Sequence, residues 1–178
     1  MHQPNVTGDW QEYDDHAGLR VRVHGLEKAE PPRGRDDAAE GLAYFRFRVT
    51  VENRASDVFG IHLEDGQIDI RIGADGESAF FDWRNSQFIE GFDLYPLRRA
   101  TAVLYAAGAD ASLNQVDIQI QLKADEEWAE RYLWSGGIGL HEGEAEGADV
   151  AARTGAAVES LACQVSNFLR GEAGPGPA

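Results

Sequence analysis

The chain has 178 residues, of which 43% are apolar, and it carries a formal net charge of −15. This length allows one domain with a substantial core, and the apolar fraction excludes a disordered chain. A charge this negative repels phosphate backbones and anionic lipid headgroups, so we expect neither nucleic acid nor a membrane among the partners.

The single cysteine, Cys163, excludes a disulfide within the chain. Residues 1–15 are polar and acidic, without the basic region and the apolar run of a secretion signal. No apolar run approaches the roughly 18 residues that a membrane-spanning helix needs. We therefore expect a cytoplasmic protein.

Alternation of apolar and polar residues predicts four strong β-strands, at residues 18–27, 44–53, 67–73 and 114–123. In the second of these, Phe45, Phe47, Val49 and Val51 share one face. One buried and one exposed face is typical of strands in antiparallel sheets.

Weaker signals predict three further strands at residues 78–83, 98–107 and 128–135, separated by turn residues such as Gly and Asp. The result is about seven strands within residues 18–135, at the spacing of an immunoglobulin-like antiparallel β-sandwich. Residues 1–17 are expected to form an N-terminal arm before this all-β domain.

The pattern changes after the sandwich. Residues 136–148 are expected to be an acidic linker, residues 149–170 an amphipathic α-helix, and residues 171–178 a disordered tail. The helix has an apolar stripe at helical spacing, made of Val158, Leu161, Val165, Phe168 and Leu169. An isolated helix of this length is marginal in water, so the stripe either docks on its own sandwich or binds a partner or a second copy.

The order of segments within residues 18–135 forms a recognisable pattern. A strand at 44–53 ends in Asn53 and a turn, and a strand at 67–72, a loop into 94–97 and paired strands near 98–106 and 115–123 follow. This pattern resembles the immunoglobulin-like (telokin-like) sandwich domains of unknown function that are common in actinobacteria, the DUF4352 type. The resemblance implies the fold and carries no catalytic motif. Its members are typically exported or lipid-anchored, and this chain departs from them in lacking either signal and in its added helix.

The chain contains no nucleotide-binding, nucleophile-elbow or zinc-protease motif, and no two of its five histidines have metal-ligand spacing. We therefore expect no catalytic residue, no metal site, no cofactor and no enzymatic activity. Acidic turns around Asp57, Glu64, Asp65, Asp75 and Glu77 are candidate Ca²⁺ sites, although turn chemistry alone explains them.

The segment of residues 80–97 is unusually aromatic. Its aromatic and amide side chains form a possible ligand surface, for which the candidates are Trp83, Asn85, Phe88, Phe92 and Tyr95. The alternative is a crossover that packs its own aromatic side chains over the edge of a sheet.

Four arginines lie on the polar faces of two predicted strands: Arg20, Arg22, Arg46 and Arg48. They form a basic patch if these strands are neighbours, or neutral cross-strand pairs with acids such as Glu52.

These observations predict a non-enzymatic protein-interaction module, a rigid sandwich whose C-terminal helix binds a protein partner or a second copy. One alternative is an accessory or structural subunit of a larger cytoplasmic assembly, such as a phage-tail-like particle. The other is a protein that binds a small ligand or Ca²⁺.

Overall fold

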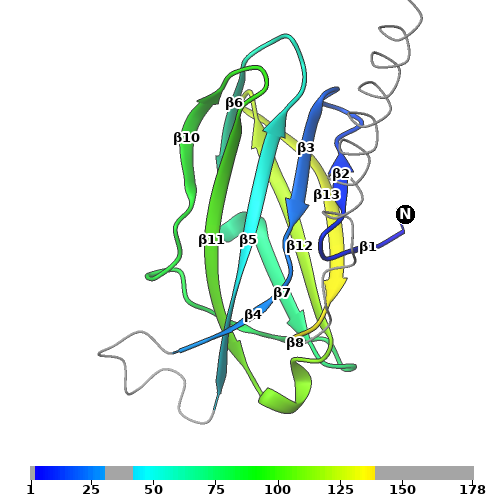
Figure 1. The fold of residues 1–178 in the computed structure, drawn as a ribbon, viewed down its shortest axis with the longest axis vertical. Coiled ribbons are helices and arrows are strands. Elements are labelled where there is room, and N and C mark those ends of the chain that lie inside the picture. The colour runs from blue at the N-terminus through cyan, green and yellow to red at the C-terminus, as the bar shows by residue number, and fades with distance from the viewer. Residues whose placement is uncertain (1–2, 31–41, 139–178) are drawn as a thin grey trace, which may run out of the picture. The chain divides into compact units, whose positions relative to one another are not determined.

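The computed structural model describes residues 3–30 and 42–138. Its strands form two sheets that enclose one apolar core, and its two short 3-10 helices lie in loops (Figure 1). The predicted C-terminal helix, its apolar stripe, Cys163 and the predicted tail lie outside the described residues.

The first sheet has seven strands. Its main path follows the order β1 (Asn5–Val6), β13 (Glu127–Gly136), β12 (Val116–Ala124), β6 (Phe59–Leu63) and β10 (Ile89–Leu94). β7 (Ile68–Ile72) also pairs with β12, and β8 (Glu77–Ser78) pairs with β7. β6 and β7 share one edge of β12, because β6 pairs only with Lys123 and Ala124 while β7 pairs with residues 116–120.

The second sheet has six strands. Its main path follows the order β2 (Trp10–Glu12), β3 (Leu19–Val23), β5 (Ala43–Asn53), β11 (Arg99–Gly108) and β9 (Phe80–Phe81), and β4 (Glu27–Ala29) pairs with β5. β11 pairs with β5 over its full length, so the two long strands form the centre of this sheet.

The core lies between the inner faces of the two sheets. Phe45, Phe47, Val49 and Val51 of β5 are all buried, as the alternation predicts. The inner positions of β12, from Val116 to Leu122, are also fully buried. Removing such side chains from water supplies roughly 1.5–3 kcal/mol each, which makes this face of every long strand decisive for folding.

The N-terminal residues belong to the sheets. β1 pairs with β13 and β2 pairs with β3, so each of the two sheets gains a strand from residues 5–12. The fully buried Trp134 of β13 donates a hydrogen bond from Nε1 to the carbonyl oxygen of Asp9 at 3.1 Å. This segment, expected as an arm, therefore closes one side of the core.

The prediction of about seven strands was wrong, because the described residues form thirteen. Four of the additional elements, β1, β2, β4 and β8, are only two or three residues long, too short to show alternation. In β10 the pattern is broken by a register shift between Ile89 and Phe92. The first sheet is also mixed and not purely antiparallel, since β1 runs parallel to β13.

The resemblance also implied that the strands near 98–106 and 115–123 pair with each other. In the structure β11 lies in the six-stranded sheet and β12 in the seven-stranded sheet, so each pairs with other strands. Strands that follow one another in the chain commonly cross between the sheets of a sandwich, and strand patterns alone do not reveal which ones do.

Candidate functional site

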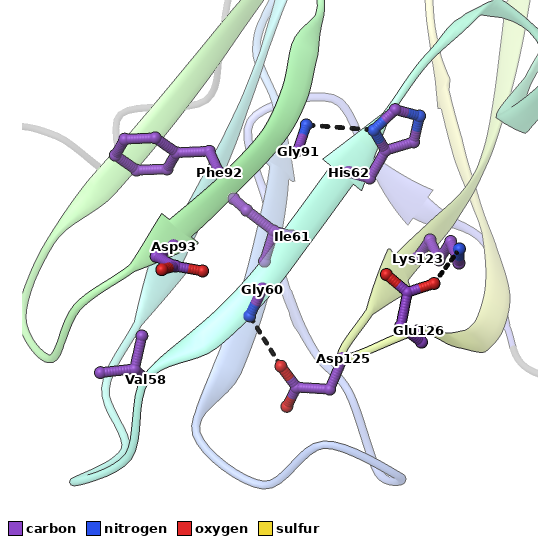
Figure 2. Close-up of a pocket in the computed structure, with 10 residues that line it drawn as sticks. All are labelled: Val58, Gly60, Ile61, His62, Gly91, Phe92, Asp93, Lys123, Asp125 and Glu126. Carbon is purple, nitrogen blue, oxygen red and sulfur yellow. Dashed lines mark hydrogen bonds and ion pairs between the residues drawn. The ribbon is translucent and has the colours of Figure 1, made fainter.

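A groove of about 620 Å³ lies where β6, β10 and the β12–β13 turn meet (Figure 2). We call it the β6–β10 groove. Its lining comprises Val58, Gly60, Ile61, His62, Gly91, Phe92, Asp93, Lys123, Asp125 and Glu126.

The groove exists because β6 leaves the edge of β12 after only two paired residues. Beyond that point β6 bonds with the β12–β13 turn instead of with β12. The backbone N–H of Gly60 donates to Asp125 Oδ1 at 2.7 Å, and the N–H of Asp125 donates to the carbonyl of Gly60 at 2.8 Å. These two bonds hold the turn against β6 and leave a hollow beside them.

The polar side of the groove is acidic. Figure 2 shows the carboxylates of Asp93 and Asp125 near Gly60, and a methyl group added to Gly60 would lie 3.9 Å and 3.5 Å from their Oδ1 atoms. Lys123 Nζ donates to Glu126 at 2.6 Å, and this hydrogen bond lowers the pKa of the Glu126 carboxyl. No described residue pairs with the side chain of Asp93, so the groove keeps an excess of negative charge.

The His62 imidazole is held on both of its nitrogens. The N–H of Gly91 donates to Nδ1 at 3.1 Å, and Nε2 lies 3.2 Å from the carboxylate of Glu64. The first bond makes Nδ1 an acceptor, so the proton of the neutral ring resides on Nε2 and points to Glu64. His62 therefore ties β6 to the bulge of β10.

Exposed apolar side chains lie around the acidic part of the groove. Phe92 is 50% exposed and Val58 is 42% exposed, and both line the groove. Tyr95 and Leu97, just beyond β10, are 60% and 81% exposed. The pairing of Leu94 with Phe59 brings Tyr95 next to Val58. Gathered apolar side chains of this size on a surface are typical of an interaction site.

The backbone is strained at the same end of the sandwich. Three described residues other than glycine have positive φ angles, Leu97 at 60°, Asp125 at 48° and Glu126 at 66°. Two of them line the groove and the third lies in the loop that follows β10. Such conformations cost about 1–3 kcal/mol each and concentrate at functional sites.

Asn53 supports the loops beside the groove. Its buried amide donates to the carbonyl oxygens of Asp57 at 2.7 Å and Leu94 at 2.8 Å, and its Oδ1 accepts from the N–H of Ala55 at 2.8 Å. Its backbone carbonyl also accepts from the N–H of Leu97 at 2.8 Å. One side chain thus fixes the β5–β6 turn and the end of β10.

The structure separates the five residues of the predicted ligand surface. Trp83, Phe92 and Tyr95 are exposed. Asn85 instead donates to the Asp82 carboxylate at 2.6 Å, which closes the turn after β9. Phe88 packs against the core, with its ring 6.0 Å from that of Phe81. The five residues predicted on the C-terminal helix lie outside the described residues.

Several groove residues were not among the sequence predictions, notably Gly60, His62, Lys123 and Asp125. The alternation of Phe59, Ile61 and Leu63 was a usable signal for β6. No sequence signal shows that Gly60 meets Asp125, because 65 positions separate them.

Within the part of the chain that the structure describes, no three His, Cys, Asp or Glu side chains converge in a way that could hold a metal ion. Among residues 3–30 and 42–138, no helix has both the length and the apolar character that crossing a membrane requires.

Neither a protein-family model nor a curated protein matches the chain. Among solved structures, yjhA from Bacillus subtilis is similar at a TM-score of 0.52 and 14% identity, over 76% of this chain and 99% of that one. The ycdA protein of Bacillus subtilis is similar at a TM-score of 0.52 and 10% identity, over 74% of this chain. MPT63, a secreted protein of Mycobacterium tuberculosis, has 16% identity and a TM-score of 0.49, over 75% of this chain and 98% of that one.

The similarity to yjhA and ycdA defines the fold class, a β-sandwich, and extends to nothing finer. The chain spans only 39% of the length of ycdA.

Proposed function

We propose that this protein is a non-enzymatic protein-interaction module, and that its β6–β10 groove binds a basic and apolar segment of a protein partner. The observation that carries the proposal is the set of exposed apolar side chains in and next to the groove, Val58, Phe92 and Tyr95, together with the carboxylate of Asp93, with which no described residue pairs. Aromatic and aliphatic side chains supply the contact area, and the carboxylates select a cationic partner.

Binding is favoured over catalysis by the state of the groove's polar groups. His62 is engaged with Gly91 and Glu64, and Lys123 with Glu126. A general acid or base must instead reach the proton that it transfers. These contacts support a role in shaping the groove.

Selection from a random peptide display library against the full chain tests the proposal. We expect the enriched peptides to combine Lys or Arg with aromatic or aliphatic residues, and to bind in fluorescence anisotropy at physiological salt. The variant Phe92→Ser keeps the charge of the groove but removes apolar area, so it should weaken binding about ten-fold.

Val6→Ser is the matched control, because Val6 is 61% exposed on β1, the strand at the opposite end of the same sheet from β10. It should leave the affinity unchanged. The proposal fails if no peptide is enriched, or if Phe92→Ser and Val6→Ser bind the enriched peptides equally well.

The predicted C-terminal stripe is a second proposed contact of the same module. Leu161→Asp and Phe168→Asp in the full chain should abolish partner binding or self-association if the stripe provides it, as measured by light scattering with and without the partner. If both variants bind the partner and self-associate as the wild type does, the stripe is not a contact and the β6–β10 groove remains the proposed binding site.

We further propose that the sandwich is of the immunoglobulin-like, DUF4352 type. The strand that ends in Asn53 supports this assignment, since the loops of the fold are anchored on that side chain. Intermediate sequences that align across the whole sandwich with both this chain and established members would test it.

A further inference from the structure

The outer face of the six-stranded sheet carries two cross-strand rows of polar and aromatic residues. The strand register aligns Glu12, Arg20, Glu52 and Arg99 in the first row, and Trp10, Arg22, Thr50 and Thr101 in the second. Directly opposed residues of antiparallel strands point to the same side. The intervening residues of β5, such as Val49 and Val51, face the core, so both rows lie on the outside.

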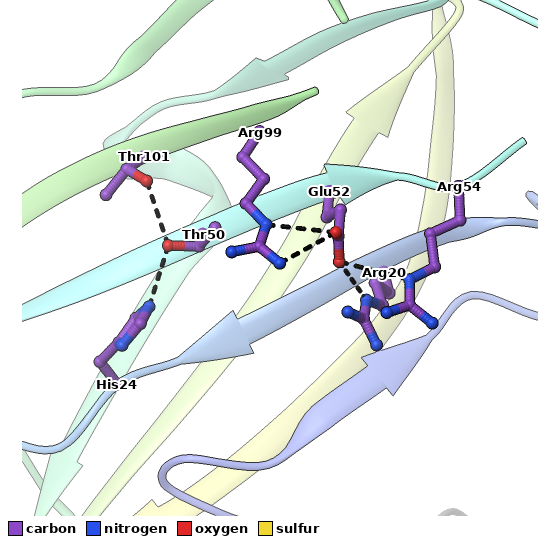
Figure 3. Close-up of polar contacts among 7 residues, drawn as sticks. All are labelled: Arg20, His24, Thr50, Glu52, Arg54, Arg99 and Thr101. Carbon is purple, nitrogen blue, oxygen red and sulfur yellow. Dashed lines mark hydrogen bonds and ion pairs between the residues drawn. The ribbon is translucent and has the colours of Figure 1, made fainter. Parts of the chain in front are cut away.

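Glu52 is the centre of the first row and is surrounded by arginines (Figure 3). Arg20 forms a short ion pair with its carboxylate, Arg99 lies at 3.1 Å and Arg54 at 3.5 Å. Burial would raise the pKa of Glu52, but the hydrogen bonds and charges of Arg20 and Arg99 outweigh burial and lower it. Glu52 therefore stays ionised and satisfies only part of the guanidinium charge around it.

We define the arginine face as Arg20, Arg22, Arg48, Arg54 and Arg99. These five guanidinium groups outnumber the neighbouring carboxylates of Glu12, Glu52 and Glu90, the last of which lines a hollow together with Arg99. Arg46 is not counted, because Glu27 pairs with it at 2.7 Å. The sequence left two alternatives for these arginines, a basic patch or neutral cross-strand pairs. Each applies in part, since Arg20 and Arg46 are paired with acids and the remaining arginines form a basic patch.

Two members of the arginine face have no counter-ion among the described residues. Arg48 is exposed and no described carboxylate pairs with it. Arg22 is only 8% exposed, and its Nε has no hydrogen-bond partner in the described part of the chain. A buried donor without a partner is energetically unfavourable, and this atom lies out of reach of solvent, so Arg22 adds positive charge to the face without contacting a ligand through Nε.

Trp10 orders the arginines around it. The centre of its indole ring lies 4.0 Å from the guanidinium carbon of Arg20, 5.7 Å from that of Arg99 and 5.9 Å from that of Arg22. Cation–π contacts at these distances hold guanidinium groups in place before a ligand arrives. Trp and Arg are also the residues most enriched at the centres of protein interfaces.

We infer that the arginine face binds an acidic segment of a protein partner, whose carboxylates are bound by Arg54 and Arg99. Guanidinium groups form strong charge-assisted hydrogen bonds with carboxylates, and both of these arginines are more than half exposed. Arg99 already donates to Glu52 from Nε at 3.2 Å and from Nη2 at 3.1 Å, so its Nη1 is the donor left for the partner. A sheet face is broad and suits a protein surface better than a small molecule, which prefers a concave pocket.

A fluorescein-labelled oligoglutamate peptide of about ten residues tests this inference by fluorescence anisotropy with the full chain. We expect saturable binding that weakens with salt. The double variant Arg54→Ala/Arg99→Ala should bind at least about ten-fold more weakly. The conservative variant Arg54→Lys/Arg99→Lys keeps the charge but loses the guanidinium donors, and it should bind several-fold more weakly.

Arg71→Ala/Arg131→Ala is the matched control, because it removes the same charge from β7 and β13 of the other sheet. It should stay within about two-fold of the wild type. Equal losses in the two double alanine variants, no binding of oligoglutamate, or tighter binding of a single-stranded oligonucleotide would each overturn the inference. If Arg54→Ala/Arg99→Ala does not fold, Arg54→Ala alone provides the comparison, since Arg54 is exposed.

The two proposals are tested independently. The groove is expected to take a basic segment and the arginine face an acidic one, so Arg54→Ala/Arg99→Ala should still bind the peptides selected on the groove.

Discussion

Asn53 is a small buried residue on which the candidate site depends. Its amide donates hydrogen bonds to the carbonyl oxygens of Asp57 in the β5–β6 turn and of Leu94 at the end of β10, both beside the groove. Buried carbonyl groups that lose a donor pay a desolvation cost, because water cannot replace the lost partner.

We predict that Asn53→Ala lowers the free energy of unfolding by about 2 kcal/mol, since one buried carbonyl, one partly buried carbonyl and one N–H lose their partner. Urea denaturation measures this loss, and hydrogen exchange should show faster exchange near residues 55–58 and 94–98. Asn114→Ala is the control, because Asn114 is exposed. Equal stability of the two variants would contradict the role of Asn53.

The β12–β13 hairpin is the element that shapes the groove, and its turn is strained. Asp125 and Glu126 both have positive φ, the conformation of a two-residue turn that favours Asn-Gly. Neither residue is glycine, so the strain is retained where Asp125 contacts Gly60.

We predict that Asp125→Asn/Glu126→Gly raises the free energy of unfolding by about 1 kcal/mol. The Asn side chain can still accept the hydrogen bond from Gly60, and the exposed pair of Glu126 with Lys123 contributes little. Thermal and urea denaturation of the double variant and both single variants measures the gain. A destabilised double variant would show that the turn is not strained.

At the scale of the whole molecule, the two sheets are joined beside their N-terminal strands by a pair of tyrosines. Tyr13 follows β2 of one sheet and Tyr132 belongs to β13 of the other, and their rings meet edge to face at 4.9 Å. Burial, and then the hydrogen bond to the Glu130 carboxylate, raises the pKa of Tyr132 from 10.0 to about 12. Burial also raises the pKa of Tyr13 above its ordinary value.

A raised folded-state pKa means that the neutral phenol is favoured by folding. The stability that it contributes is complete below the unfolded pKa of 10.0 and is lost as the pH rises towards about 12. We predict that Tyr132→Phe reduces the fall in stability between about pH 9 and about pH 11 by roughly 1 kcal/mol. Urea denaturation at both pH values measures this, and an unchanged slope would contradict it.

Much of the sandwich could be predicted from local sequence. The apolar alternation of β3, β5, β7 and β12 identified the strands and the faces that point to the core. The short strands were missed, because two or three residues carry no period and their stability comes from a longer neighbour.

Charge and alternation along the chain thus determined that this is an acidic all-β protein with a core built from long amphipathic strands, because burial of one face depends on the period of the sequence alone. Only the tertiary structure decided that Gly60 meets Asp125, and that three arginines meet one Glu52. These contacts depend on strand order and register, which join residues far apart in the chain and leave no local signal.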